Sequence, residues 1–149
     1  EFLNRARTTF ARACEDEGVE LVLDNQWKDG APLRTDIDLV MCVAGVLVAN
    51  ACRHGRHGAS SRVVMRLDEA HERIHLDVID NGPGIEAEDA RHLYTPFRRG
   101  KTAESKAKGG LGLGLALARS AGELLDEMDA RYVSPSQSRT SDVGERQAA

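Results

Sequence analysis

Three short stretches of the sequence hold the residues whose types and spacing could do chemistry, at positions 50–54, 80–84 and 109–114. The first combines an amide with an arginine and a histidine, the second sets a carboxylate before two glycines, and the third is rich in glycine. Amide oxygens are hard ligands that suit Mg²⁺, arginine suits phosphate, and glycine backbone at a helix start presents N–H groups to anions. Together the stretches indicate a site for a phosphorylated ligand.

Asp80 stands out because of the face of a predicted strand on which it lies. It follows three apolar residues at every second position, and alternate residues of a strand share one face, so this face should point at the core. A carboxylate there is costly unless a hydrogen bond satisfies it, and the amino group of an adenine ring could supply that bond. The alternative, which the residue taken alone favours, is that Asp80 is simply the turn residue before Asn81.

The glycine run at 109–114 brings backbone close to whatever lies at the start of the next helix, where N–H groups form an anion site. The run is not a Walker A loop, because no Gly-Lys-Ser/Thr follows it. It is not a Rossmann fingerprint either, because the spacing of the third glycine fails and a basic stretch, not a strand, precedes it. A flexible hinge is the alternative to phosphate binding.

Asn50 and His54 are four residues apart, so they are neighbours on one helix face, with Arg53 beside them. Asn50 could ligate a Mg²⁺ ion that also holds phosphate oxygens, and Arg53 could hold phosphate by charge-assisted hydrogen bonds. His54 could stack or hydrogen-bond. The alternative is a helix that becomes polar where it leaves the core.

The elements that must position these residues follow from apolar spacing and turn signals. We expect a helix over 3–14 that Gly18 ends, a strand over 19–24, and a long helix from a capping box at Thr35 and Asp38 to Gly55. A hairpin of strands 62–67 and 74–80 follows, with a turn over 68–73. The remaining predicted elements are helices over 86–93 and 110–125 and a short strand over 131–133.

The chain has 149 residues and a net charge of -4, with 41% hydrophobic and 30% charged residues, which is a globular balance. A net charge of this sign and size does not indicate a surface that binds nucleic acid. The nearly apolar stretch 39–52 is shorter than the roughly 20 residues of a bilayer span. Three cysteines without C-x-x-C spacing indicate plain thiols in a reducing compartment. We therefore expect a cytoplasmic domain over 1–133 with no nucleic-acid partner and no direct membrane contact, followed by a disordered tail over 134–149.

Taken in order, four motifs resemble the boxes of the ATP-binding catalytic domain of sensor histidine kinases. They are Asn-Ala-x-Arg-His at 50–54, Asp-Asn-Gly-Pro-Gly-Ile at 80–85, Pro-Phe-Arg-Arg-Gly at 96–100 and Gly-Leu-Gly-Leu-Gly-Leu at 110–115. The resemblance covers about residues 3–125, and the domain shares a superfamily with gyrase, Hsp90 and MutL. It implies an α+β fold: a two-layer α/β sandwich of the Bergerat type, with a mixed, mostly antiparallel sheet covered by about three helices.

The resemblance also implies roles for matching positions, with ATP and Mg²⁺ as the bound molecules. Asn50 would be the Mg²⁺ ligand, Arg53 a phosphate contact and His54 a ring beside adenine, and Asn50, Arg53 and Arg99 would be closest to the chemistry. Residues 98–109 would form the ATP lid. The other nucleotide-binding positions would be Asp80, Gly82, Gly84, Ile85, Phe97, Gly110, Leu111, Gly112, Leu113 and Gly114. Arg98, Lys101, Lys106 and Lys108 are further cations that could offset phosphate charge.

The implied activity is protein-histidine kinase activity, in which the γ-phosphoryl group of ATP moves to a histidine on a separate dimerisation domain of the same protein. A response regulator would be an indirect partner, and the parent protein could be a membrane-bound sensor with this domain in the cytosol. His71-Glu72 has the letters of the acceptor motif but falls in the predicted hairpin turn, so we reject it as the acceptor.

The sequence departs from the family pattern at two places. Val46 stands four positions before Asn50, where many relatives carry a polar residue. Glutamate there is the water-activating base of the gyrase and Hsp90 branch, so we do not expect hydrolysis of that type. The Gly-Thr-x-Phe strand that usually closes the sheet is also missing, so the last strand should be absent or altered.

Two other functions compete with the kinase interpretation. Val46 permits a non-catalytic nucleotide-binding regulator, in the manner of a pseudokinase or an anti-sigma factor. The residues His71-Glu72-Arg73-Ile74-His75 spell the H-E-x-x-H motif of zinc hydrolases, which requires a helix to bring both imidazoles to one metal. On a strand, residues four apart lie roughly 13 Å apart, which is too far.

Overall fold

The computed structural model describes residues 1–27, 35–55, 58–70, 73–98, 111–123 and 128–133. In chain order they form α1 (Phe2–Asp16), β1 (Glu20–Asn25), α2 (Ile37–His54), the short 3-10 helix η1 (Gly58–Ser60), β2 (Arg62–Ala70), β3 (Arg73–Asp80), α3 (Ala87–Ala90), α5 (Gly114–Glu123) and β4 (Met128–Val133). The predicted tail over 134–149 and all but the first residue of the predicted lid lie outside the described residues.

The four described strands form one mixed sheet in the order β1-β2-β3-β4. Strands β2 and β3 pair antiparallel, as the predicted hairpin requires. Strand β1 runs parallel to β2, and β4 runs parallel to β3. The expectation of a mostly antiparallel sheet is therefore wrong for these strands. The physical reason is that a helix separates the members of each parallel pair, and a strand–helix–strand connection returns the second strand in the direction of the first.

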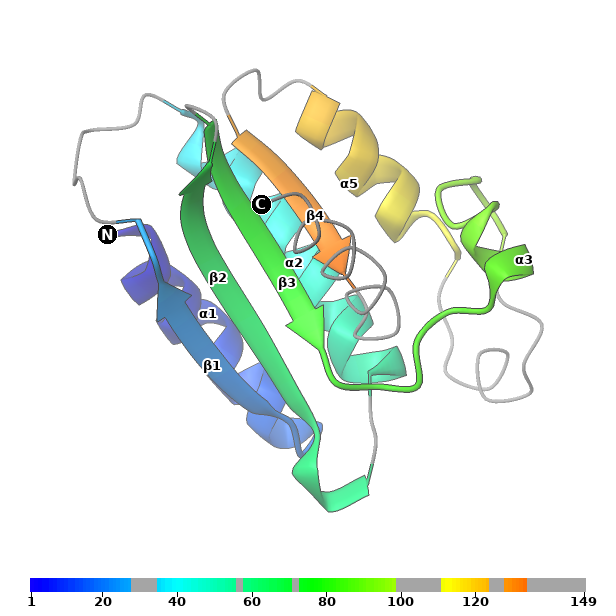
Figure 1. Ribbon diagram of the computed structural model, residues 1–149, viewed down its shortest axis with the longest axis horizontal. Helices are drawn as coiled ribbons and strands as arrows, with labels where there is room; N and C mark the ends of the chain where they lie inside the picture. Colours follow the sequence, from blue (N-terminus) through cyan, green and yellow to red (C-terminus); the bar gives the residue numbers. More distant parts are fainter. Residues whose placement is uncertain (28–34, 56–57, 71–72, 99–110, 124–127, 134–149) are drawn as a thin grey trace, which may run out of the picture.

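Helices α1, α2 and α5 cover one face of the sheet, so the fold has two layers (Figure 1). The core lies between the layers and is built from the inward faces of these helices and of strands β1, β2 and β3. Alternation along β3 places Ile74, Leu76 and Val78 in this core, as the sequence predicts. The expected two-layer α+β sandwich with a mixed sheet and about three covering helices is confirmed.

Helix α2 is the central helix, because it contacts α1, α5 and the sheet. By length and composition alone its 18 residues could cross a membrane. Eight of those residues, however, are buried in the core between the sheet and the neighbouring helices. The apolar character of α2 is therefore explained by its place at the centre of the domain. The same place makes it the element that carries Asn50, Arg53 and His54 to one end of the sheet.

The N-terminus of α2 differs from the predicted one by a single residue. Asp36, not Thr35, caps the helix: its carboxylate accepts the backbone N–H groups of Asp38 and Leu39 at 3.1 and 3.0 Å. Aspartate and threonine are both good N-cap residues, so side-chain type alone does not choose between two neighbours.

Other boundaries also shift. The strands β2 and β3 extend into the predicted 68–73 turn, and the helix predicted over 86–93 is reduced to the single turn α3. Helix α5 begins at Gly114, later than the predicted start at Gly110. The strand predicted over 131–133 exists and is longer, as β4.

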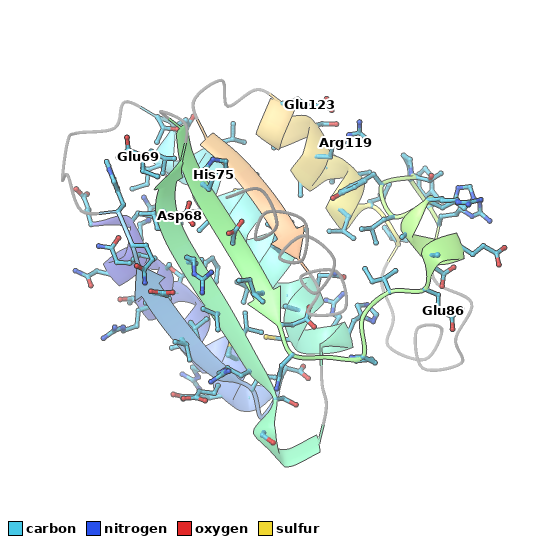
Figure 2. The ribbon with its side chains drawn as sticks, viewed as in Figure 1. Asp68, Glu69, His75, Glu86, Arg119 and Glu123 are labelled. Carbon is cyan, nitrogen blue, oxygen red and sulfur yellow. The ribbon has the colours of Figure 1, made fainter. Side chains whose placement is uncertain are left out.

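An H-E-x-x-H zinc site needs a helix over residues 71–75, but residues 73–75 belong to a strand. Residues 71–72 lie outside the described residues, but His75 lies in strand β3, beside Asp68 of β2 (Figure 2). A strand spreads residues that are four apart along its length instead of bringing them to one metal. The zinc hydrolase alternative therefore loses its structural basis.

Candidate functional site

The C-terminal end of α2 lies directly against the end of β3, where Gly55 meets Asp80. A β-carbon built on Gly55 would stand 2.6 Å from the Cβ of Asp80 and 2.5 Å from the carbonyl oxygen of Ala51. A β-carbon built on Gly82 would stand 2.5 Å from the Cα of Gly55. No side chain fits at these distances, so two glycines allow the helix end, the strand end and the following turn to meet.

Asp80 is the carboxylate that the sequence pattern singles out, and it is 2% exposed. Among the residues whose burial the structure describes, it is the only buried one that can carry a charge, apart from the thiols. Its Oδ1 accepts the backbone N–H of Gly82 at 2.8 Å. Because an ionised carboxylate offers about four lone-pair positions, it can accept this N–H and the amino group of a ligand together.

Asn81 has a positioning role that sequence reasoning missed. Its Oδ1 accepts the backbone N–H of Arg62 at 2.7 Å, and its Nδ2 donates to the carbonyl oxygen of Ser60 at 2.8 Å. These bonds tie the turn after β3 to the start of β2 and to η1. The available signal was the general tendency of asparagine side chains to bond to backbone, but the partner could not be read from the sequence.

One face of α2 meets the start of α5. A β-carbon built on Gly114 would stand 3.2 Å from Cγ1 of Val46. Asn50 lies one helical turn after Val46 on the same face, so it follows the contact with α5. Asn50 is half-buried, whereas Arg53 and His54 are exposed at the helix end. The structure thus places Asn50, Arg53 and His54 in the last turns of α2, the helix whose end meets β3 and whose face meets α5.

Phe97, from the predicted motif at 96–100, is in contact with Gly112, from the predicted motif at 110–115. The backbone N–H of Phe97 donates to the carbonyl oxygen of Gly112 at 3.0 Å. Both residues have left-handed backbone, with φ of 62° at Phe97 and 69° at Gly112. A β-carbon on Gly112 would stand 2.7 Å from the carbonyl oxygen of Arg98. The close approach at this point therefore depends on glycine, and it fixes the start of α5 relative to the segment before the predicted lid.

The other predicted site residues divide into described and undescribed positions. Gly84, with φ of 84°, and Ile85 lie in the segment that leads from β3 to α3. Leu113 is half-buried and Leu111 is 75% exposed, just before α5. Arg99, Gly110, Lys101, Lys106 and Lys108 lie outside the described residues.

The donor set of this junction fits a Mg²⁺ ion held together with phosphates. No three His, Cys, Asp or Glu side chains of the described residues gather closely enough to hold a metal. An amide oxygen is a hard ligand of the kind that Mg²⁺ accepts, and Asn50 lies one helical turn after Val46, the residue that meets the start of α5. Mg²⁺ is commonly held by one or two protein oxygens plus substrate phosphates, whereas a zinc site needs three or four protein ligands.

Residues 35–145 match the family described as histidine kinase-, DNA gyrase B- and HSP90-like ATPase. The matched range includes α2, the β2–β3 hairpin, α5 and β4. It therefore includes every segment of the junction described above.

Curated relatives of this chain include sensor kinases. The autoinducer 2 sensor kinase/phosphatase LuxQ of Vibrio cholerae is 30% identical over 114 residues, which is 75% of this chain and 13% of LuxQ. The probable sensor histidine kinase TcrY of Mycobacterium tuberculosis is 36% identical over 99 residues, which is 63% of this chain and 20% of TcrY. This chain thus corresponds to a small part of the length of these relatives.

Solved structures share the fold at low sequence identity. The catalytic domain of the histidine kinase ThkA superposes with a TM-score of 0.65 and 19% identity, over 85% of this chain and 76% of that one. The mycobacterial sensor histidine kinase MprB superposes with a TM-score of 0.65 and 20% identity, over 83% of this chain and 76% of that one. At such identities the likeness concerns the architecture.

Proposed function

The chain belongs to the family of histidine kinase-, DNA gyrase B- and HSP90-like ATPases, and on this basis we propose that it is the ATP- and Mg²⁺-binding catalytic domain of a two-component sensor histidine kinase. The observation that carries the proposal is the buried carboxylate of Asp80, set at a junction where Gly55 and Gly82 remove all side-chain bulk. A carboxylate can accept further hydrogen bonds beside that from the N–H of Gly82, and the amino group of adenine is a donor of the matching kind.

The adenine ring is proposed to bind at the ends of α2 and β3. Asp80 accepts the amino group of the base while Gly82 donates its N–H to the same carboxylate, which holds the carboxylate in place. Asn81 anchors this turn to β2. His54 and Ile85 are the ring and the apolar side chain proposed to flank the base.

The phosphates are proposed to lie between α2 and the start of α5. Backbone N–H groups at the start of a helix attract anions, and Gly112 and Gly114 keep this helix start free of side-chain bulk. Asn50 would hold Mg²⁺, which when bound offsets the negative charge of the phosphates. Arg53 and Arg99 are the cations that we propose for binding phosphate oxygens.

The proposed reaction is transfer of the γ-phosphoryl group of ATP to a histidine on a separate dimerisation domain of the parent protein. Phosphoryl transfer depends mainly on positioning and electrostatic stabilisation, so no acid–base pair is required in this domain. A response regulator would receive the phosphoryl group afterwards. We propose a cytoplasmic location, with residues 1–133 as the catalytic domain.

A non-catalytic nucleotide-binding regulator is the second candidate, and Val46 is the observation that favours it. Val46 places an apolar Cγ1 against Gly114, at the position where many relatives carry a polar side chain. An apolar residue there cannot activate water, so a domain of this kind could bind nucleotide without hydrolysing it.

Two measurements test the proposal. Calorimetric titration of this chain with a non-hydrolysable ATP analogue should give saturable binding that is tighter with Mg²⁺ than without it. Incubation of the full-length parent with γ-labelled ATP should then label a histidine of the dimerisation domain. Binding without labelling would favour the regulator, and an absence of binding would reject both nucleotide-based functions.

A further inference from the structure

Cys14 and Cys52 form a pair of thiols that the proposed nucleotide chemistry does not use. Cys14 lies in the last turns of α1 and Cys52 in the last turn of α2, and their Sγ atoms are 3.4 Å apart. Both side chains are buried, with 0% and 4% of their surface exposed. The pair is the contact by which the end of α1 meets the helix that carries Asn50 and Arg53.

The two thiols are chemically different. The Cys52 thiol donates a hydrogen bond to the Sγ of Cys14, and this bond lowers the pKa of Cys14 because it stabilises a thiolate there. The same bond, together with burial, raises the pKa of Cys52. A thiolate is the form of cysteine that reacts with oxidants. The lowered pKa assigns Cys14 as the first thiol to react, and Cys52 is the thiol within reach of the product because its Sγ lies 3.4 Å away.

We propose that Cys14 and Cys52 are a redox modification site, at which a hydroperoxide converts the two thiols into an internal disulfide between α1 and α2. In the first step the Cys14 thiolate attacks the hydroperoxide: the O–O bond breaks, an S–O bond forms to give a sulfenic acid, and the leaving hydroxide or alkoxide takes up the proton that the Cys14 thiol released, so that water or an alcohol departs. In the second step the Cys52 sulfur attacks the Cys14 sulfur, the S–O bond breaks, and water leaves with the Cys52 proton. Two thiols are oxidised and one hydroperoxide is reduced.

The geometry requires only a short movement. A disulfide needs about 2.05 Å between the sulfur atoms, so the two must approach by little more than an ångström, which small side-chain and helix-end shifts can supply. Cys14 is two residues from the end of α1, where its carbonyl oxygen already accepts N–H groups from Glu17 and Val19 outside the helix. These bonds close the last turn, so the reaction requires a transient local opening of the end of α1, through which a small oxidant such as hydrogen peroxide reaches the buried sulfur.

The modification site is connected to the nucleotide junction by backbone alone, and this part of the inference rests on the proposed function. Cys52 follows Ala51, whose carbonyl oxygen accepts the N–H of Gly55 at 2.7 Å. Gly55 in turn has no spare room against Asp80. The disulfide would draw the last turn of α2 toward α1 and so displace Gly55 relative to Asp80 at the proposed adenine site. We therefore expect the disulfide form to bind nucleotide more weakly.

The crosslink is tested without any nucleotide, in the full chain carrying Cys42→Ser. Cys42 is exposed and lies outside the pair, and its removal leaves one cysteine in each of the tryptic peptides 13–28 and 35–53. After treatment with dilute hydrogen peroxide and unfolding, both remaining thiols should resist maleimide labelling, and mass spectrometry should find the two peptides joined. Dithiothreitol should restore both thiols. Cys14→Ala or Cys52→Ala in this background should leave the remaining cysteine unable to form the linked peptide.

The wild-type chain supplies the contrary outcome. If the thiols of Cys14 and Cys52 remain open to labelling after a peroxide dose that oxidises the exposed Cys42, the modification site is rejected. Because Cys42 and Cys52 share the tryptic peptide 35–53, fragmentation of the linked peptides locates the bond, and a bond at Cys42 in place of Cys52 would reject the site as well. Because these readouts come from the wild-type and Cys42→Ser chains, they do not depend on the folding of the alanine variants.

The connection to nucleotide binding is tested by titrating the reduced and oxidised forms of the Cys42→Ser chain with a non-hydrolysable ATP analogue. The disulfide form should bind the analogue at least about fivefold more weakly than the reduced form. Fivefold is the lower end of the coupling that is typical between two sites. Equal affinities with the crosslink present would overturn the connection. No binding by the reduced form would instead reject the proposed function and leave the crosslink result standing.

Discussion

Gly55, at the end of helix α2, packs against the side chain of Asp80. A β-carbon built on Gly55 would lie 2.6 Å from the Cβ of Asp80. The carboxylate proposed to bind adenine and the helix proposed to bind Mg²⁺ are therefore in direct contact. A change at either residue must be transmitted to the other. This relationship gives separate predictions for the chemistry of Asp80 and for the fit around it.

Asp80→Asn should weaken binding of a non-hydrolysable ATP analogue roughly ten- to hundredfold, because a hydrogen bond to a charged group is worth about 1.5–3 kcal/mol. The asparagine Oδ1 can still accept the N–H of Gly82, so the fold should persist. Asp77→Asn, on the opposite face of β3, is the matched control and should bind normally. Calorimetry on both variants decides, and equal affinities would remove Asp80 from the adenine site.

Asn50→Ala should abolish the advantage that Mg²⁺ gives to nucleotide binding. The amide oxygen is the proposed protein ligand of the ion, and alanine has no oxygen to replace it. Affinity measured with and without Mg²⁺ should become nearly equal, whereas the control Asn25→Ala, at the exposed end of β1, should keep the difference. A variant at position 50 that still binds more tightly with Mg²⁺ would assign the metal to another ligand.

Gly55→Ala should destabilise the chain by about 1–3 kcal/mol, the usual cost of an added methyl group in a filled space. The new methyl would meet the Ala51 carbonyl and the Asp80 side chain, neither of which can move freely. Gly122→Ala in α5 is the control, because a β-carbon there meets nothing within 4 Å. The control should gain about 0.5–1 kcal/mol from helix propensity. Denaturant unfolding of both variants measures these free energies.

Gly112→Ala should cost more than Gly58→Ala, although both glycines have nearly the same left-handed φ, 69° and 68°. The backbone penalty of about 1–2 kcal/mol is common to both. Only Gly112 adds a clash, because its β-carbon would stand 2.7 Å from the carbonyl oxygen of Arg98, whereas Gly58 has open space. Unfolding free energies and nucleotide affinities of the two variants should separate the backbone penalty from the clash. Equal losses of stability in the two variants would show that the contact with Arg98 does not matter.

Gly114→Ala and Val46→Ala should be non-additive. The methyl group added at Gly114 must displace Cγ1 of Val46, which stands 3.2 Å away, but in the double variant that carbon is gone. A double-mutant cycle should therefore give a coupling free energy of about 0.5–3 kcal/mol that favours the double variant. The pair Val46→Ala and Gly122→Ala, with no shared contact, should be additive.

Local patterns predicted much of the fold. The alternation that ends in Asp80 predicted which face of β3 is buried, because strand periodicity follows directly from residue order. The order strand, helix, strand around α2 could also have predicted that β1 runs parallel to β2, but the family resemblance favoured antiparallel pairing. The choice of Asp36 over Thr35 as the cap was not available from side-chain type.

The candidate site was predicted as a set of segments and not as a set of contacts. Asp80 and Asn50 carry recognisable chemistry, so their types and spacing drew attention to them. Gly55 and Asn81 do not, because a close packing distance and a bond to the backbone of Ser60 arise only once distant strands and helices are assembled. The roles proposed for Arg53, His54 and Arg99 stay predictions.

The contact of Gly55 and Gly82 with Asp80 also limits how this domain could escape an inhibitor. A compound that competes with adenine and packs against these two glycines would lie on bare backbone, where resistance usually requires a new side chain. Any such side chain would stand less than 3 Å from neighbouring atoms. A mutant that kept the compound out would thereby damage its own adenine site.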